Sequence, residues 1–314
     1  MKKVMFVVND GNFFVSHRLA IAQKLLERKY QVHLAVGENF ANKTLNASSL
    51  IIHPVKLSRS DVSPLSNLVL FIQFVILFLR VRPDLVHLIT IKPVLLGGIA
   101  SLFFSKMSVV AAITGLGYLY TSTTFKSKLV RYITRFLYKL ALSKKRLVVI
   151  FQNNDDQNVI NSIISLPEDK IRLIKGSGVD LKKYYFSSLP KGIPIVMLAS
   201  RLLVDKGVRE FVETARKFKQ GYTKARFVIV GAPDYGNLAS ISKKQLEIWV
   251  ADGIVEWWGF REDMPKVISE SCIVILPSYR EGFPKILMEA SACGRPIITT
   301  DVPGCRDSII PNET

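Results

Sequence analysis

The sequence is short of cysteine, and the few cysteines present exclude a disulfide framework. Three occur in 314 residues: Cys272, Cys293 and Cys305. They show no metal-ligand spacing, and an odd number of thiols in apolar segments favours reduced cysteines in a cytoplasm. The N-terminus has a run of only five apolar residues, 4–8, before Asn9. A signal-peptide core needs roughly 7 to 15, so we expect a first strand there instead.

Acidic residues are scarce in the first part of the chain, which leaves a strong positive charge there. The whole sequence carries a formal net charge of +18, from 43 Lys and Arg against 25 Asp and Glu. Residues 1–190 hold 26 of these bases and 10 of these acids, a balance of +16. This asymmetry favours a polyanionic partner: nucleic acid, an anionic membrane surface or a pyrophosphate substrate. Greater solubility is the alternative.

Several functional motifs are also missing. The run VMFVVNDGNFF lacks the Gly-x-Gly-x-x-Gly that follows the first strand of a Rossmann oxidoreductase or epimerase. No zinc-ligand spacing, RNP-like motif or basic zipper is present, so we expect no nucleic-acid partner. No Asp-x-Asp occurs either. This argues against the metal-dependent sugar-nucleotide transferases, and we expect that no metal cofactor is needed.

Two series of apolar, β-branched runs alternate with helical patterns and predict two parallel sheets. The first comprises residues 4–8, 32–36, 85–89, 109–113 and 147–151, and the second residues 195–199, 226–230, 254–258, 272–276 and 296–300. We therefore expect an α/β protein with two doubly wound, Rossmann-like domains facing a cleft, at residues 1–188 and 193–314. Ser, Pro and Gly in residues 187–194 (SSLPKGIP) mark the join.

One apolar stretch, residues 68–79 (LVLFIQFVILFL), is shorter than the roughly 20 residues that span a bilayer. It is apolar on nearly every side, so it predicts a helix that either packs in the core or makes shallow contact with lipid. Residues 130–145 predict a second helix. Its basic side chains would either face solvent or contact lipid headgroups. It carries the bases Arg131, Arg135, Lys139, Lys144 and Lys145.

The segment SYREGFPKILMEASACGRPIITT places two carboxylates in otherwise apolar surroundings. The apolar run before it, with Pro284 and Gly294, predicts a strand, a loop and a helix. Glu289 lies on the flank of the apolar stripe of this helix. Its burial would require a cation, a backbone donor or ligand hydroxyls as a partner. Glu281 lies in the loop at the carboxyl end of a parallel strand, where open α/β sheets bind their ligands.

Groups that could bind anions accompany these carboxylates. The amides of Gly282 and Phe283 precede the helix at its positive end and would suit a phosphate. Arg201 and Lys206 follow the strand at residues 195–199 and could hold a diphosphate from the other side. A nucleotide sugar has a diphosphate with hydroxyl groups on either side of it, which these cations, amides and carboxylates could bind. It is therefore the ligand we expect.

These stretches resemble a known family. ASRLLVDKG, GFREDMP and SYREGFPKILMEASACGRPII are similar to the donor domain of retaining GT-B glycosyltransferases of family four (glycosyl transferases group 1). The spacing of Glu281 and Glu289 is the signature of that family. FFVSHRLAIAQKLLERKYQVHLA, ITGLGYLY and GSGVDLKKY resemble the acceptor half of the subgroup that acts on lipid-linked sugars. The resemblance extends over the whole chain and implies a hexosyltransferase.

The resemblance also implies where the nucleotide-sugar donor would bind. The groups beside the transferred sugar and the diphosphate would be Glu281, Lys206 and Arg201. The rest of the donor site would comprise the loop before the helix, a ribose-binding carboxylate and an aromatic that lies either beside the base or in the core. These residues are Gly282, Phe283, Pro284, Glu289 and Phe260.

The implied reaction transfers a sugar, with retention, from a nucleotide-diphosphate sugar to a polyprenyl-diphosphate-linked sugar acceptor. We expect UDP as the nucleotide, and an enzyme of capsule, lipopolysaccharide or glycoprotein glycan synthesis. Such an enzyme would be cytoplasmic and peripherally bound to the inner face of the cell membrane, where the basic N-terminal half would contact anionic lipid.

On the acceptor side the sequence departs from the family pattern. The first loop is Asn9-Asp10-Gly11-Asn12 in place of a glycine pair, and Ile89 replaces a second histidine. Residues that could shape the acceptor side are Asn9, Asp10, His17, His87, Thr114 and Gly115, and for both histidines a structural role is the alternative.

The family also continues past residues 311–314 with further donor-domain elements and a helix that crosses back to the first domain. We therefore expect the second domain to be incomplete at its C-terminus. The alternative function is a catalytically weak or inactive remnant that still binds nucleotide or membrane.

Overall fold

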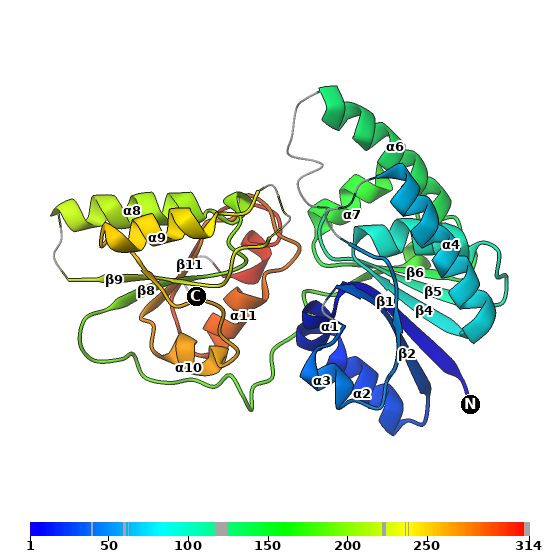
Figure 1. Ribbon diagram of the computed structural model, residues 1–314, viewed down its shortest axis with the longest axis horizontal. Helices are drawn as coiled ribbons and strands as arrows, with labels where there is room; N and C mark the ends of the chain where they lie inside the picture. The colour runs from blue at the N-terminus through cyan, green and yellow to red at the C-terminus, as the bar shows by residue number, and fades with distance from the viewer. Residues whose placement is uncertain are drawn as a thin grey trace. The chain divides into compact units, whose positions relative to one another are not determined.

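The protein consists of two α/β units, each built on a parallel sheet. The structure is a computed structural model that describes residues 1–38, 40–58, 61, 63–116, 125–221, 224–235, 237 and 239–310. The chain divides into Met1–Ser177 and Gly178–Thr314 (Figure 1). The expected α/β architecture with two doubly wound domains is therefore confirmed.

The first unit contains a seven-stranded parallel sheet in the order β3-β2-β1-β4-β5-β6-β7. Its strands are β1 (Lys3–Asp10), β2 (Gln31–Glu38), β3 (Ile51–Pro54), β4 (Leu85–Ile89), β5 (Ser108–Ile113), β6 (Leu147–Phe151) and β7 (Ile171–Leu173). All five expected strands are present. The edge strands β3 and β7 were not expected, because they are short and largely exposed, and so lack the continuous apolar run of a strand covered on both faces.

Helices cover both faces of this sheet. One face is packed by α1 (Gly11–His17), α2 (Leu19–Glu27) and α3 (Lys43–Asn46). The other is packed by α4 (Pro64–Val81), the π-helix η1 (Pro93–Gly97), α5 (Gly98–Ser101), α6 (Phe125–Ala141) and α7 (Asn154–Asn161). A 3-10 turn, η3 (Glu168–Lys170), leads into β7. Alternation along β1 supplies both cores, since Met5 and Val7 face one layer while Phe6 and Val8 face the other.

Helix α4 is longer than the apolar stretch that predicted it, with 18 residues. Among the described residues it is the only helix with the length and apolar composition of a membrane span. The expected core packing is confirmed for one side, where Leu70, Phe74, Phe78 and Val81 are buried at helical spacing. The opposite side remains exposed and is formed by Leu65, Leu68, Val69, Ile72, Ile76 and Leu79.

Lys144 does not belong to the basic surface that we expected at residues 130–145. It is buried just after α6, and its Nζ donates to the carbonyls of Ser101 (2.7 Å) and Phe104 (2.8 Å) at the end of α5. Burial lowers its pKa. Lys144 therefore satisfies carbonyl groups at a helix C-terminus.

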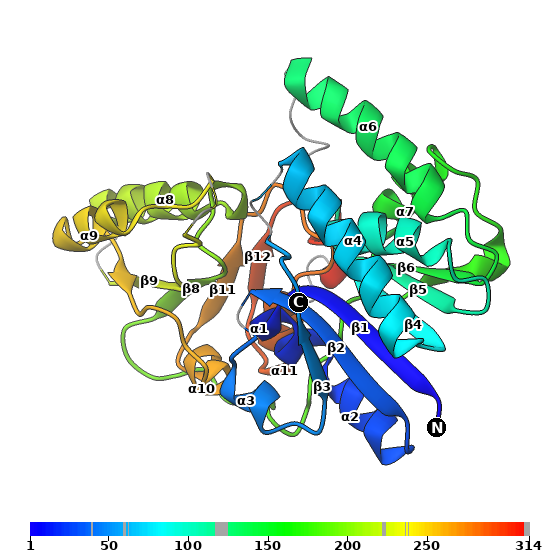
Figure 2. The ribbon, with the colours of Figure 1, turned by 45° about the vertical axis from the view of Figure 1, so that its right-hand side comes forward.

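The second unit contains a five-stranded parallel sheet in the order β10-β9-β8-β11-β12. Its strands are β8 (Ile195–Ala199), β9 (Arg226–Val230), β10 (Glu256–Trp257), β11 (Ile273–Leu276) and β12 (Ile297–Thr299). Helices α8 (Val208–Gly221) and α9 (Lys243–Ala251) pack on one face, and α10 (Met264–Ser269) and α11 (Lys285–Ala292) on the other (Figure 2). The 3-10 turns η4 (Val204–Lys206) and η5 (Arg306–Ser308) follow β8 and β12.

The join between the units lies earlier than the expected break at 188–193. Residues 178–192 belong to the second unit. Arg295, which is 2% exposed, donates to the Ser187 carbonyl at 2.8 Å, and Tyr184 packs against the core beside α11. Composition marks residues 187–194 as the join, but the Arg295 guanidinium donates to Ser187 and Ser188 and so attaches the start of this stretch to the second unit.

We predict that the first unit loses stability in mild acid through a histidine pair. His33 Nδ1 lies 2.9 Å from His53 Nε2, and burial, followed by His53, lowers the pKa of His33 to about 4. Below pH 6.5 the unfolded chain therefore binds protons that the folded unit does not, so stability falls as the pH drops from about 6.5 towards 4. Denaturant titrations should show His33 contributing a loss of about 1 kcal/mol between pH 7 and 5.5. His33→Gln should lose correspondingly less, and identical pH profiles for variant and wild type would contradict the prediction.

Candidate functional site

The topology of the second sheet brings two predicted site residues together. Chain order reverses between the neighbouring strands β8 and β11, and open α/β sheets bind ligands at such a switch point, beyond the carboxyl ends of the strands. Lys206 ends the turn after β8, and Glu281 lies in the loop after β11. Lys206 Nζ lies 2.6 Å from Glu281 Oε1, and the two side chains are 11% and 15% exposed. The sequence placed both groups near a ligand but not in contact with each other.

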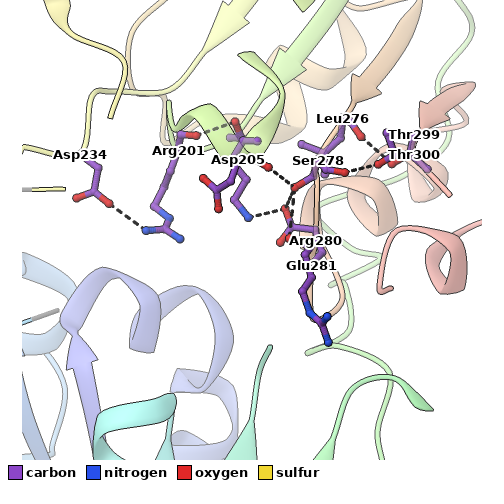
Figure 3. Close-up of polar contacts among 11 residues, drawn as sticks. Arg201, Asp205, Asp234, Leu276, Ser278, Arg280, Glu281, Thr299 and Thr300 are labelled. Atoms are coloured by element: carbon purple, nitrogen blue, oxygen red, sulfur yellow. Dashed lines mark hydrogen bonds and ion pairs between the residues drawn. The ribbon is translucent and has the colours of Figure 1, made fainter. Parts of the chain in front are cut away.

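Ser278 links the two loops and was missed in the sequence. This fully buried residue has its Oγ 3.0 Å from both the Asp205 carbonyl and Glu281 Oε1 (Figure 3). The Tyr279 amide also donates to the Asp205 carbonyl, at 2.9 Å. Thr300 Oγ1 donates in turn to the Ser278 carbonyl. A loop serine has no recognisable pattern of its own, so only its position just before the acidic loop could have indicated this role.

Glycine permits the close approach of the two loops. Gly207 has a φ of +72°, and a Cβ built there would lie 2.1 Å from the Pro277 carbonyl oxygen. Gly304 is similarly close to the loop after β11, since its Cβ would lie 2.5 Å from the Glu281 carbonyl oxygen. Backbone packing on both sides therefore holds the Glu281 loop in place.

Arg201 was predicted to hold a diphosphate together with Lys206. In the structure it forms an ion pair of its own, apart from Lys206 and Glu281. Its Nη1 lies 2.9 Å from Oδ2 of Asp234, a residue of the loop after β9 (Figure 3). These side chains are 47% and 30% exposed, so solvent screens the pair and weakens it. This edge of the second sheet thus carries two separate ion pairs, one enclosed and one exposed to solvent. No motif in the sequence drew attention to Asp234.

The second carboxylate, Glu289, has the cation partner that its burial required. It lies on α11 with 6% of its surface exposed, and Lys285 Nζ, one helical turn earlier, is 3.0 Å from its Oε1. Pro284 is the N-cap of this helix. Gly282 and Pro284 are buried, and Phe283 is half-buried. Phe260 is 66% exposed, so the alternative that it packs in the core was wrong.

On the first unit, predicted acceptor residues lie at the carboxyl edge of the sheet. Chain order reverses between β1 and β4, and there Asn9, which is 4% exposed, accepts a hydrogen bond from Thr90 Oγ1 at 2.9 Å. Asp10 caps α1 by accepting from the Phe13 amide at 2.9 Å. Thr114 and Gly115 follow the next strand, β5, and are half-buried.

The two predicted histidines have ring contacts of their own within the first unit. His17 ends α1 and stacks on Phe13, with ring centroids 4.1 Å apart. His87 is paired with Phe6 inside the sheet and is 8% exposed. Burial, with a smaller contribution from Arg18, lowers the pKa of His87 to about 3. The neutral, enclosed imidazole favours the structural alternative for His87.

Family models match most of the chain. Residues 3–153 match the model described as glycosyl transferase 4-like, and residues 193–314 match the model described as glycosyl transferases group 1. The first match covers β1 to β6 but ends before β7, and the second covers all five strands of the second sheet.

Individual relatives match over most of the chain. The N,N'-diacetylbacillosaminyl-diphospho-undecaprenol alpha-1,3-N-acetylgalactosaminyltransferase of Campylobacter jejuni is 31% identical, over 98% of this chain and 82% of the relative. The UDP-Gal:alpha-D-GlcNAc-diphosphoundecaprenol alpha-1,3-galactosyltransferase of Escherichia coli is 24% identical, over 81% of this chain and 66% of the relative. Among solved structures, Anabaena HepE in complex with UDP and glucose superposes with a TM-score of 0.72 at 20% identity, covering 99% of this chain and 83% of HepE.

Two parallel-sheet units of this kind, with these structural neighbours, define the GT-B fold of sugar transferases. The match to the Campylobacter enzyme and to both family models is more specific. The chain belongs to the glycosyl transferases group 1 family and is a glycosyltransferase.

We predict that Gly207→Ala destabilises the second unit more than an equivalent change elsewhere. Gly253 has a similar φ of +65°, but a Cβ there meets nothing within 4 Å. Gly253→Ala should therefore cost only the left-handed backbone penalty of about 1 kcal/mol. Gly207→Ala should cost at least twice as much, because its Cβ would also collide with Pro277. Denaturant unfolding measures both variants, and equal losses would show that the loop contact is unimportant.

Proposed function

We propose that this glycosyltransferase transfers a sugar from a UDP-sugar, with retention, to a polyprenyl-diphosphate-linked sugar. The observation that carries the proposal is the enclosed Lys206–Glu281 pair at the switch point of the second sheet. Lys206 offers a cation to a nucleoside diphosphate and Glu281 offers acceptors to sugar hydroxyls, in the place where this class of fold binds ligands.

The names of the relatives support the choice of substrates. The Campylobacter and Escherichia coli enzymes are both named for diphospho-undecaprenol sugars as acceptors. The Escherichia coli enzyme is also named for UDP-galactose, and HepE is bound to UDP. Polyprenyl-diphosphate acceptors and a UDP-linked donor are therefore the substrates we propose here.

In the proposed mechanism, Lys206 stabilises the leaving group. The bond between the anomeric carbon and the diphosphate oxygen breaks, and its electron pair leaves with the nucleoside diphosphate. The acceptor hydroxyl oxygen bonds to the same carbon and releases its proton. Lys206, Arg201 and the amides before α11 would lower the barrier by meeting the new negative charge, with no role for a metal ion.

The two glutamates would hold different parts of the donor. Glu281 is oriented by Lys206 and Ser278, and in the proposed complex it accepts hydrogen bonds from hydroxyls of the transferred sugar. Glu289 would accept from the ribose hydroxyls. Phe260, exposed near the loop after β10, would pack beside the base.

We also propose that the first unit binds peripherally to anionic membrane at the inner face of the cell membrane. Helices α4 and α6 cover the same face of the sheet, and both contact α5 and η1 (Figures 1 and 2). The outer side of α4 is exposed and apolar, and α6 carries further exposed apolar groups. The α6 groups are Tyr132, Ile133, Phe136 and Leu140, and the bases Arg135 and Lys139 are exposed among them. Apolar side chains accompanied by bases suit a surface of anionic headgroups.

Three variants should separate the roles of the donor-site residues. Lys206→Ala should lower kcat by roughly 10² or more, because it removes one preorganised charge from the transition state. Glu281→Gln should lower kcat more than it weakens UDP binding. Glu289→Ala should mainly raise KM for the donor, since ribose contacts are similar in ground and transition states.

The measurement is transfer kinetics with the donor varied, together with calorimetric binding of UDP. Lys243→Ala, which removes an exposed lysine on α9, is the control and should be neutral. Unchanged transfer by both Lys206→Ala and Glu281→Gln would mean that the donor site lies elsewhere.

Liposome flotation should test the membrane proposal. Binding should require anionic lipid and decrease with salt, because each base near the surface contributes about 1 kcal/mol and ions screen it. Leu68→Glu with Leu79→Glu, on the exposed side of α4, should reduce flotation severalfold. Leu181→Glu changes an equally exposed leucine of the second unit and should have no effect. Equal flotation with neutral and anionic lipid would contradict the proposal.

A further inference from the structure

Tyr184, which we expected in the first domain, lies in the second unit beside Lys285, the partner of the buried carboxylate Glu289. Arg295 fixes this part of the chain to the second unit through Ser187. Tyr184 is partly buried against the core beside α11. Burial raises its pKa, and the charge and hydrogen bonding of Glu289 raise it further. The phenol therefore keeps its proton, and its hydroxyl can donate to Glu289.

Lys285 completes a cluster of three side chains. Its Nζ lies 3.0 Å from Glu289 Oε1 and 6.0 Å from the centroid of the Tyr184 ring. The pair Lys285–Glu289 has side-chain exposures of 23% and 8%. An ion pair with the same helical spacing, Lys243–Glu247 on α9, is 3.5 Å long with exposures of 59% and 58%. Only the enclosed pair is desolvated enough to restrict how its carboxylate is oriented.

The cluster leaves Glu289 with unused acceptor capacity. A carboxylate has about four acceptor positions, and Lys285 and Tyr184 account for two of them. Two adjacent hydroxyls on a ring could take up the others, provided that the carboxylate does not rotate. Both partners of Glu289 oppose such a rotation, one by charge and one by a directed hydroxyl.

We infer that Tyr184 and Lys285 are positioning residues that hold Glu289 to select ribose over deoxyribose in the donor nucleotide. This inference rests on the proposed function, in which Glu289 meets the ribose. Tyr184 and Lys285 act through Glu289, so they determine the discrimination between sugars more than the strength of nucleotide binding.

Calorimetric titration with UDP, 2′-deoxy-UDP and 3′-deoxy-UDP tests the inference. The wild-type chain should bind UDP about tenfold more tightly than either analogue, the scale of one hydrogen bond to a charged group. Tyr184→Phe and Lys285→Met should each reduce that ratio about threefold or more, with little change in Kd for the deoxy analogues. Lys285→Arg should preserve the ratio. Tyr185→Phe, an exposed neighbouring tyrosine, and Lys243→Met are matched controls that should leave it unchanged.

The outcomes separate the inference from the function on which it rests. If Glu289→Ala abolishes the ratio while Tyr184→Phe and Lys285→Met retain it, the positioning role is wrong and the ribose contact stands. If Lys285→Met weakens UDP and both analogues equally, Lys285 binds phosphate instead and the inference is wrong. If the wild type shows no preference and Glu289→Ala changes nothing, the ribose role of Glu289 fails, and the inference fails with it.

Discussion

The need to compensate buried carboxylates organises the second unit. Glu281 and Glu289 are both largely removed from water, and each has a lysine partner within 3.0 Å. An isolated carboxylate at such positions would cost several kcal/mol. The partners differ in origin, because Lys285 comes from the same helix as Glu289, whereas Lys206 comes from a loop 75 residues away in the chain. The Lys206–Glu281 pair therefore joins the loops after β8 and β11.

The surrounding backbone makes that pairing possible. Gly207 and Gly304 allow carbonyl groups to approach where a side chain would collide, and Ser278 connects the Asp205 carbonyl to the Glu281 carboxylate. These contacts fix the geometry of the loops before any ligand is bound. In the proposed mechanism this preorganisation would lower the reaction barrier, because the charges need not be rearranged as the leaving group departs.

The first unit is organised differently, around an apolar layer between its sheet and α4, α5 and α6. Phe74 and Phe78 bury one side of α4 in that layer. The buried Lys144 donates a hydrogen bond to the Ser101 carbonyl at the C-terminal end of α5. The outer side of α4 has no such partner among the described residues. One helix thus combines a core face with an exposed apolar face, which explains why its sequence reads as apolar on nearly every side.

Much of this protein could be predicted from its sequence. Continuous β-branched runs identified ten strands, because strands covered on both faces must be apolar throughout. Strands β3 and β7 were not predicted, because they are short and exposed and need no such run. The acidic spacing and the two bases predicted which loops would form the donor site, since residue type and order along the chain mark a loop and its chemistry. The structure brings Lys206 and Glu281 of these loops together.

Tertiary structure alone decided which groups meet. Hydrogen bonds and ion pairs depend on distances of about 3 Å between segments that chain order leaves unrelated. The pairing of Arg201 with Asp234, the buried place of Lys144 and the attachment of Tyr184 beside Glu289 all arise in this way. A sequence pattern records what each segment buries, but the partner that compensates a buried charge is set by how the segments pack.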